Sequence, residues 1–502
     1  MGGLTYREFH VACFKSRRRR SMRRMIGIAW LFGLLALPTL ATAQLIPIKS
    51  VPIATGGQFM IYPTQNYGMA GLSIARNDTL LDPFSNPARG ALFTGTSFYT
   101  LPTIYLISED LGSARTFPLG LMYGSAEWFG AAVFSLQQLK GAGNSNFDPG
   151  LGNLSLTNTY FHGLFGKHIP DVNASLAVGL TWANLKGLDG VDLLYANSRK
   201  IEQSGDMLNV SVGIYKELVN EQTLDLLMLY NRFRMQHDVT YWNWGWRGVD
   251  FINDQASESV VRNNDHSNTI GMQVGYTRPL GGKGWQFGVH AAGNWKSHPK
   301  IPNYELQNIP RDPGDSDAYQ VGFGLVHQKN RSTFGFDVIY EPIWSNTWAD
   351  AAEPIESASG RIIQPGQITV NNDFEFSNMI MRFGLQTRGK ARDFQLGLQV
   401  RSISYSLDQY NYVEERRRDL QESWMEWGLT WGWNFRLSDF TLIYQGSLLS
   451  GVGRPGISGG GISPTLDFSA DAANFIIAPS GSLTLQEAVV FTHRITFLIP
   501  LD

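Results

Sequence analysis

"MEWGLTWGWNFR", residues 425–436, alternates large apolar side chains with small or polar ones. The apolar set is Trp427, Leu429, Trp431, Trp433 and Phe435, and the other set is Glu426, Gly428, Thr430, Gly432, Asn434 and Arg436. Because successive side chains of a β-strand point to opposite faces, this period of two predicts a strand with one apolar face. In a transmembrane barrel that face contacts lipid, whereas in a soluble sandwich it forms the core.

The same alternation recurs from about residue 96 to the end of the chain, for example over residues 172–184 and 393–401. Most of the predicted strands reach the roughly 9–11 residues that a tilted strand needs to cross a bilayer. The sixteen expected strands are 96–107, 116–124, 126–137, 155–167, 172–184, 206–217, 222–234, 267–279, 284–295, 317–328, 332–344, 376–387, 392–405, 422–436, 439–449 and 486–499. An even number places both barrel ends on one side of the membrane.

The links between these strands alternate in length. Short links lie near 125, 168–171, 218–221, 280–283, 329–331, 388–391 and 437–438, and long links lie near 138–154, 185–205, 235–266, 296–316, 345–375, 406–421 and 450–485. Tight periplasmic turns and large external loops alternate in this way in an up-and-down barrel, but not in a Greek-key sandwich. We therefore expect an all-β fold: a transmembrane up-and-down antiparallel β-barrel of about 14–16 strands.

Composition favours the same class of protein. Aromatic residues make up 12% of the chain, charged residues 17%, and glycine 53 of 502 residues. A soluble enzyme of this length would normally show helical periods and more charge. The aromatic residues near expected strand ends, which are typical of interfacial girdles, are Trp128, Trp285, Trp295, Tyr340, Trp344 and Trp424.

Residues 1–43 have the pattern of a cleavable signal peptide. A basic tract at 17–20 precedes an apolar run at 26–37, and Ala41-Thr42-Ala43 closes the segment. The apolar run is shorter than the roughly 20 residues of a membrane-spanning helix, and its flanks fit export better than a buried core helix. We therefore expect cleavage before Gln44 and location in the bacterial outer membrane.

Removal of the leader changes the charge of the chain. Residues 1–43 hold eight basic residues and one acidic residue, so the remainder carries 33 basic and 42 acidic residues. This net negative charge argues against nucleic acid as a partner. The only cysteine, Cys13, lies in the leader, so the mature chain can form neither a disulfide nor a cysteine metal site. We expect no metal and no cofactor.

Residues 44–95 lack strand alternation and are broken repeatedly by glycine and by Asp-Pro and Asn-Pro pairs. Their apolar content disfavours disorder, and the barrel interior is the nearest surface that can bury it. The expected domains are therefore 1–43 as signal peptide, 44–95 as a hatch inside the lumen and 96–502 as the barrel. Twelve glycines on expected inward positions fit a packed interior: Gly179, Gly213, Gly271, Gly275, Gly288, Gly322, Gly324, Gly335, Gly384, Gly397, Gly428 and Gly432. Relief of curvature strain is the alternative explanation.

The stretch "YGMAGLSIARNDTLLDPFSNPARGALF", residues 67–93, resembles the N-terminal hatch of the FadL-type outer-membrane transporters of long-chain fatty acids and other hydrophobic compounds. The matching residues are Gly68, Ala70, Gly71, Asn77, Asp78, Asn86, Pro87 and Ala88. The resemblance covers about thirty residues and implies a barrel of fourteen strands and passive uptake of hydrophobic small molecules. A related branch, the PorV-like proteins, shares this start and implies the alternative function of an outer-membrane anchor or shuttle that binds protein cargo for a secretion system.

Two groups of residues are candidate sites. The first is "YWNWGWRG", residues 241–248 of a long external loop, with Tyr241, Trp242, Trp244 and Trp246. Exposed aromatic clusters often capture ligands, but these side chains could equally pack one external loop against another over the barrel mouth. The expected lumen charges are Arg382, Arg401, Glu426, Arg436 and Arg494, together with Asp225, His290, Asp337 and Glu341. They predict a polar conduit, a set of arginines that binds a carboxylate, or a solvated and mutually paired interior that braces the hatch.

Enzyme chemistry finds little support. "GISGG", residues 456–460, is not a nucleophile elbow, and nothing in the sequence places a serine and a carboxylate beside His493. The expected partners are a hydrophobic small-molecule ligand, outer-membrane lipid and lipopolysaccharide, and the barrel-assembly machinery. The alternative function adds a secretion complex.

Overall fold

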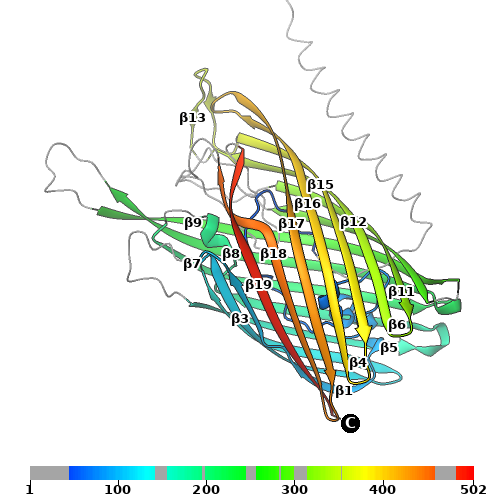
Figure 1. Ribbon diagram of the computed structural model, residues 1–502. Coiled ribbons are helices and arrows are strands. Elements are labelled where there is room, and N and C mark those ends of the chain that lie inside the picture. The colour runs from blue at the N-terminus through cyan, green and yellow to red at the C-terminus, as the bar shows by residue number, and fades with distance from the viewer. Residues whose placement is uncertain are drawn as a thin grey trace, which may run out of the picture.

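The computed structural model describes residues 45–141, 155–194, 198–244, 256–281, 284–298, 314–351, 353–457 and 482–501, so the expected signal peptide lies outside it. The strands are tilted and form one closed antiparallel sheet (Figure 1), because the strand at Gly95–Thr100 pairs both with the strand at Gly112–Gly124 and with the last strand of the chain. The predicted all-β barrel is confirmed. No helix in the described ranges is long and apolar enough to span a membrane.

The wall strands are β1 (Gly95–Thr100), β2 (Thr103–Ile107), β3 (Gly112–Gly124), β4 (Trp128–Lys140), β5 (Ser155–Ile169), β6 (Ala174–Leu185), β7 (Lys200–Glu217), β8 (Thr223–Trp244), β9 (Ala256–Leu280), β10 (Trp285–His298), β11 (Gly314–Lys329), β12 (Ser332–Asp350), β15 (Ile368–Arg388), β16 (Arg392–Asn411), β17 (Arg416–Arg436), β18 (Thr441–Ile457) and β19 (Leu483–Pro500). The short hairpin of β13 (Ile355–Glu356) and β14 (Ile362–Ile363) lies outside the wall. The helical turns are η1 (Tyr67–Met69), α2 (Asp82–Ser85), η2 (Pro87–Leu92), η3 (Pro170–Val172), α3 (Val191–Leu194) and η4 (Val219–Glu221).

β1 and β2 are two halves of one wall strand. Both pair with β3 in a single register, from Gly95 opposite Gly124 to Thr103 opposite Thr116. The break falls at Pro102, which has no N–H to give to the ladder. Counted in this way the wall has sixteen strands, one for each range expected from the alternation, and the fourteen strands implied by the family resemblance are wrong for this chain.

The outer surface of the wall is apolar over its middle. On β6, Leu176, Val178 and Leu180 are 46%, 50% and 41% exposed, whereas Ala177 between them is buried. β16 and β17 repeat this pattern with Leu396, Leu398 and Leu429 on the outside. Such a belt of outward apolar side chains is what the hydrocarbon layer of a membrane requires.

Several strands extend well beyond the expected ends. The link expected at 406–421 is largely strand, because β16 and β17 pair as far as Asn411 opposite Arg416. The outward residues Ser402, Ser404 and Ser406 are polar, so the apolar signal ends there although the ladder continues. Backbone hydrogen bonds do not depend on an apolar face, and hydrophobic alternation therefore marks the membrane part of a strand and not its end.

Between β17 and β18 the wall opens at one end. These strands pair only from Trp427 opposite Ser450 to Arg436 opposite Thr441. β18 then turns away at Gly451, whose φ is +83° and where a Cβ would stand 2.0 Å from the carbonyl O of Met425. Residues 52–54 take up part of the free edge: Ala54 N–H donates to Gly453 O (2.9 Å), and Gly453 N–H donates to Pro52 O (2.9 Å).

Residues 45–94, here called the N-terminal segment, pack against the inward face of the wall, and Figure 1 shows this segment in blue within the ring of strands. A Cβ at Gly397 would lie 2.2 Å from Ala70 N, and one at Gly288 would lie 2.3 Å from Ile74 O. At these two positions only glycine leaves room for the approaching backbone. A Cβ at Gly428 would instead meet Gln399 of the wall at 3.6 Å, so a close approach of the N-terminal segment does not account for this inward glycine.

We predict that Leu429→Arg lowers the free energy of unfolding by about 2–4 kcal/mol in lipid vesicles, because it places a charge on the lipid-facing side of the wall. Gln421→Arg, on the outward side of the same strand but beyond the apolar belt, should change it little. Denaturant titration in vesicles measures both variants. Equal losses would mean that the exposed face of β17 does not contact lipid tails.

Candidate functional site

The carboxylate of Asp78, which is 2% exposed, organises the N-terminal segment. It accepts hydrogen bonds from the hydroxyl of Thr64 (2.5 Å) and from the backbone N–H groups of Gln65 (2.8 Å) and Asn66 (2.9 Å). It also accepts from the N–H of Leu81 at 3.1 Å. A carboxyl group surrounded by N–H donors satisfies backbone that no strand or helix pairs, and so holds two irregular stretches together.

A buried ion cluster joins the segment to the wall. Arg89 donates to Asp82 (2.6 Å) within the segment and to Asp225 on β8 (2.8 Å). Asn86 Nδ2 donates to the other oxygen of Asp225 (2.8 Å). Burial raises the pKa of Asp82 to about 7, although the guanidinium of Arg89 acts in the opposite direction. Pro87 packs near Gly179, and Ala88 is fully buried.

The glycine-containing turn of the quoted motif lies against β16 and β17. Ala70 has a left-handed φ of 57° and donates its N–H to Thr430 Oγ1 at 2.9 Å. Gly68 lies so close to the wall that a Cβ there would be 2.8 Å from the N of Gly432. Gly71 also has a positive φ, of 66°, and Asn77, six residues further along the segment, is exposed.

Two of the expected lumen charges hold the same turn from the other side. Arg382 Nη1 donates to Gly71 O (3.3 Å), and Asp337 accepts from the N–H of Ser73 (2.9 Å). Arg494 donates to Tyr62 O, and its guanidinium lies 4.9 Å from the ring centre of Tyr67.

The other expected lumen charges are also paired. Arg401 binds Glu341 (3.2 Å), which also accepts from Gln320, and Lys49 binds Glu426 (3.2 Å). His290 shares a hydrogen bond with Gln320 at 2.7 Å. Arg436 differs from the expectation of a lumen charge: it lies at the end of β17 with 43% of its side chain exposed, and binds Asp393 (2.7 Å). Its position in the strand has the inward parity, but the strand ends there.

The aromatic loop predicted for ligand capture is only partly described. The backbone of Tyr241, Trp242 and Trp244 forms the end of β8 and pairs with β9, from Tyr241 opposite Ser259 to Trp244 opposite Ala256. The side chains of these residues, and the whole of Trp246, lie outside the described part of the chain. Their role in capture stays a prediction.

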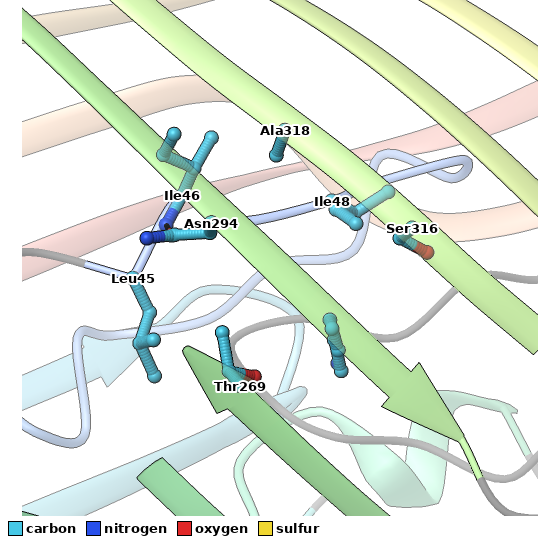
Figure 2. Close-up of a pocket in the computed structure, with 8 residues that line it drawn as sticks. Leu45, Ile46, Ile48, Thr269, Asn294, Ser316 and Ala318 are labelled. Atoms are coloured by element: carbon cyan, nitrogen blue, oxygen red, sulfur yellow. Dashed lines mark hydrogen bonds between the residues drawn. The ribbon is translucent and has the colours of Figure 1, made fainter. Parts of the chain in front are cut away.

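A small pocket lies where the N-terminal segment begins (Figure 2). Leu45, Ile46 and Ile48 form one side of it, and the N–H of Ile46 donates to Asn294 Oδ1 at 2.6 Å. The wall side consists of Thr269, Asn294, Lys296, Ser316 and Ala318, from β9, β10 and β11. The first described residues of the N-terminal segment therefore border the pocket, and a movement of these residues changes the size of the pocket.

Residues outside the predicted site also fasten the segment. Gln58 donates to Gly187 O (3.0 Å) and accepts from the N–H of Asp189 (2.9 Å), in the link between β6 and β7. Asp189 in turn accepts from the N–H of Gly56 at 2.6 Å. Burial raises the pKa of Asp189 to about 6, against the effect of that N–H. The only local signal for these contacts is the pair of glycines in "KGLDG", residues 186–190, which permits a close approach of two backbones.

No protein-family model and no curated protein matches this chain. Solved structures that resemble it include a FadL homologue from Pseudomonas aeruginosa, with 11% identity, 93% of this chain and 100% of that chain covered, and a TM-score of 0.42. The CymD monoaromatic hydrocarbon channel has 11% identity, 90% and 98% coverage and a TM-score of 0.41. The siderophore receptor PirA from Acinetobacter baumannii has 7% identity, 81% coverage of both chains and a TM-score of 0.36.

We predict that Arg89→Ala releases the N-terminal segment from β8. Removing the cation leaves Asp82 and Asp225 buried without their partner, which typically costs about 3–5 kcal/mol. Limited proteolysis of the folded protein should then cut between residues 45 and 94. Arg417→Ala, which removes an exposed pair with Asp408 (2.9 Å), is the matched control and should cost less than about 1 kcal/mol. Identical cleavage of both variants would contradict the assigned role of the buried cluster.

Proposed function

We propose that this chain is an outer-membrane channel for the passive uptake of hydrophobic small molecules, such as long-chain fatty acids or hydrocarbons. In this proposal residues 44–95 form the hatch of the channel, and the barrel of 96–502 surrounds it. A hydrophobic solute crosses the hydrated saccharide layer outside the membrane with difficulty. An apolar route through the barrel lowers that barrier because the solute leaves water early.

The observation that carries the proposal is an aromatic inner wall. Phe374 and Phe376 on β15 and Tyr405 on β16 face inward, with ring centres 5.2–5.7 Å apart. Each is at most 3% exposed, and Leu407 continues the surface. Barrels that conduct ions or sugars line their lumen with polar groups, so an inward aromatic surface favours an apolar cargo.

The beginning of the N-terminal segment covers this aromatic wall. The cover is extended chain that includes Ile46 and Ile48, both in the same apolar cluster. It is fastened by the Ile46–Asn294 hydrogen bond and by the Lys49–Glu426 ion pair. The aliphatic chain of a ligand is apolar, as the side chains of Ile46 and Ile48 are. Such a ligand can therefore replace these two side chains against the aromatic wall with little loss of buried apolar area.

The hatch must move for a ligand to reach the periplasm, and this gives a direct test. The Cβ of Met69 lies 2.7 Å from where a Cβ at Gly384 would stand. A disulfide needs a Cβ–Cβ distance of about 3.5–4.5 Å, so a Met69→Cys, Gly384→Cys pair can form one once the two backbones separate by about 1 Å. In liposomes that contain a fatty-acid sensor, we expect uptake by the oxidised variant to fall to that of protein-free liposomes, and reduction to restore it. Wild-type protein should not respond to the reductant.

Equal uptake before and after reduction would contradict a moving hatch, and wild-type uptake no faster than in protein-free liposomes would contradict the channel itself. Co-purification with a secretion complex under those conditions would favour the anchor or shuttle function instead.

A further inference from the structure

The link between β6 and β7 folds into the barrel mouth. Links between strands normally run over the surface, because buried backbone needs partners for its polar groups. Here Leu188, Val191 and Leu193 are each at most 3% exposed, and α3 contacts β18 on the far side of the mouth. Residues 187–193 therefore behave as part of the interior.

These three side chains fill an apolar site that the wall and the N-terminal segment build together. The wall contributes Tyr105 and Ile107 from β2, Val452 from β18, and Ala488 and Val490 from β19. Ile53 completes the site from the N-terminal segment. This site is distinct from the aromatic wall of β15 and β16, and every wall side chain in it is at most 5% exposed.

Hydrogen bonds fix the backbone at the start of the link. Asn158 Oδ1 accepts from the N–H groups of Lys186 (2.7 Å) and Gly187 (3.1 Å), and Gln203 Oε1 accepts from the N–H of Leu188 (3.0 Å). Gln58 uses both ends of its amide on the backbone of Gly187 and Asp189, and Asp189 accepts from Gly56. Gly190, with φ +82°, brings its backbone so close that a Cβ would lie 2.8 Å from Ile53 Cγ2. Hydrogen bonds fix where the link enters, but the contact inside the site is apolar packing without directional demands.

We propose that this site binds the alkyl chain of an uncharged hydrophobic ligand. Leu188, Val191 and Leu193 occupy the site when no ligand is bound, and a ligand that enters displaces these three side chains. The site is lined by aliphatic groups and the ring of Tyr105, which suits a hydrocarbon chain. The carboxylate of Asp189 at its rim disfavours a ligand that carries a negative charge nearby. The source of the ligand rests on the proposed uptake function, but occupancy of the site is a separate equilibrium.

The test uses an uncharged long-chain alkane that carries a photoreactive diazirine, with the full-length protein in lipid nanodiscs and cross-links located by mass spectrometry. Lipid-facing residues of the belt are labelled in every sample and serve as the reference. We expect additional labelling of β2, β18 and β19 at inward positions. This inward labelling should rise several-fold in the triple variant Leu188→Ser, Val191→Ser, Leu193→Ser, whose link no longer prefers the site.

A second variant keeps the test independent of how well the triple variant folds. Gln58→Leu removes both amide hydrogen bonds to the link and should also raise inward labelling. Gln65→Leu is its matched control, because Gln65 Nε2 bonds only to Thr79 (3.1 Å) within the segment, and it should label as wild type does. Val452→Trp should fill the site and abolish the inward signal.

Labelling confined to the lipid-facing belt in wild type and in Gln58→Leu would overturn the site. The two proposals fail differently. Inward labelling without uptake in liposomes removes the channel function and leaves the site, whereas uptake without inward labelling removes the site and leaves the channel.

Discussion

A backbone N–H or C=O in hydrocarbon costs several kcal/mol if it has no partner, so a sheet that crosses a membrane must close. In this chain closure depends on β1 and β2, which pair with β19 from Ser97 opposite Pro500 to Ile107 opposite Val490. The proline that divides them still accepts a hydrogen bond through its carbonyl, from the N–H of Ile495 at 3.0 Å. Closure of the sheet gives the barrel an interior, and the N-terminal segment packs against the inward face of that interior.

The segment is held by different forces along its length. Its middle is fixed by buried polar groups: Asp78 accepts hydrogen bonds from N–H groups, and Arg89 joins Asp82 to Asp225. Breaking such a buried cluster leaves charge unpaired, at a cost of about 3–5 kcal/mol. Its beginning is held mainly by isoleucines, each worth roughly 1.5–3 kcal/mol when fully buried. Any apolar molecule can replace that contribution, whereas little else can replace the ion cluster. For the proposed uptake function, the beginning of the segment is therefore the part that a ligand can displace while the middle stays anchored.

The sequence predicts the wall well because a period of two is a local property that each strand shows separately. It predicts the contact of the Gly-Met-Ala-Gly turn with the wall less directly, through inward glycines such as Gly397. The roles of Gln58 and Asp189 could not be predicted, since their partners lie about 130 residues away and neither residue type marks a site alone. The ends of β16 and β17 were missed for another reason: their outward faces turn polar where the membrane ends, but their ladder continues.

The seam between β17 and β18 has a free strand edge. An uncovered edge can pair with other chains, and proteins usually cover it. Here residues 52–54 bond to Gly453, so the segment that fills the lumen also covers part of the edge. Ile53 in the same stretch packs against the link of residues 186–194. Displacement of this link by a ligand removes one of the contacts that keep Ile53 in place, and so loosens the cover of the seam. A single apolar contact thus couples the barrel mouth, the N-terminal segment and one of the places where neighbouring strands of the described wall are not continuously paired.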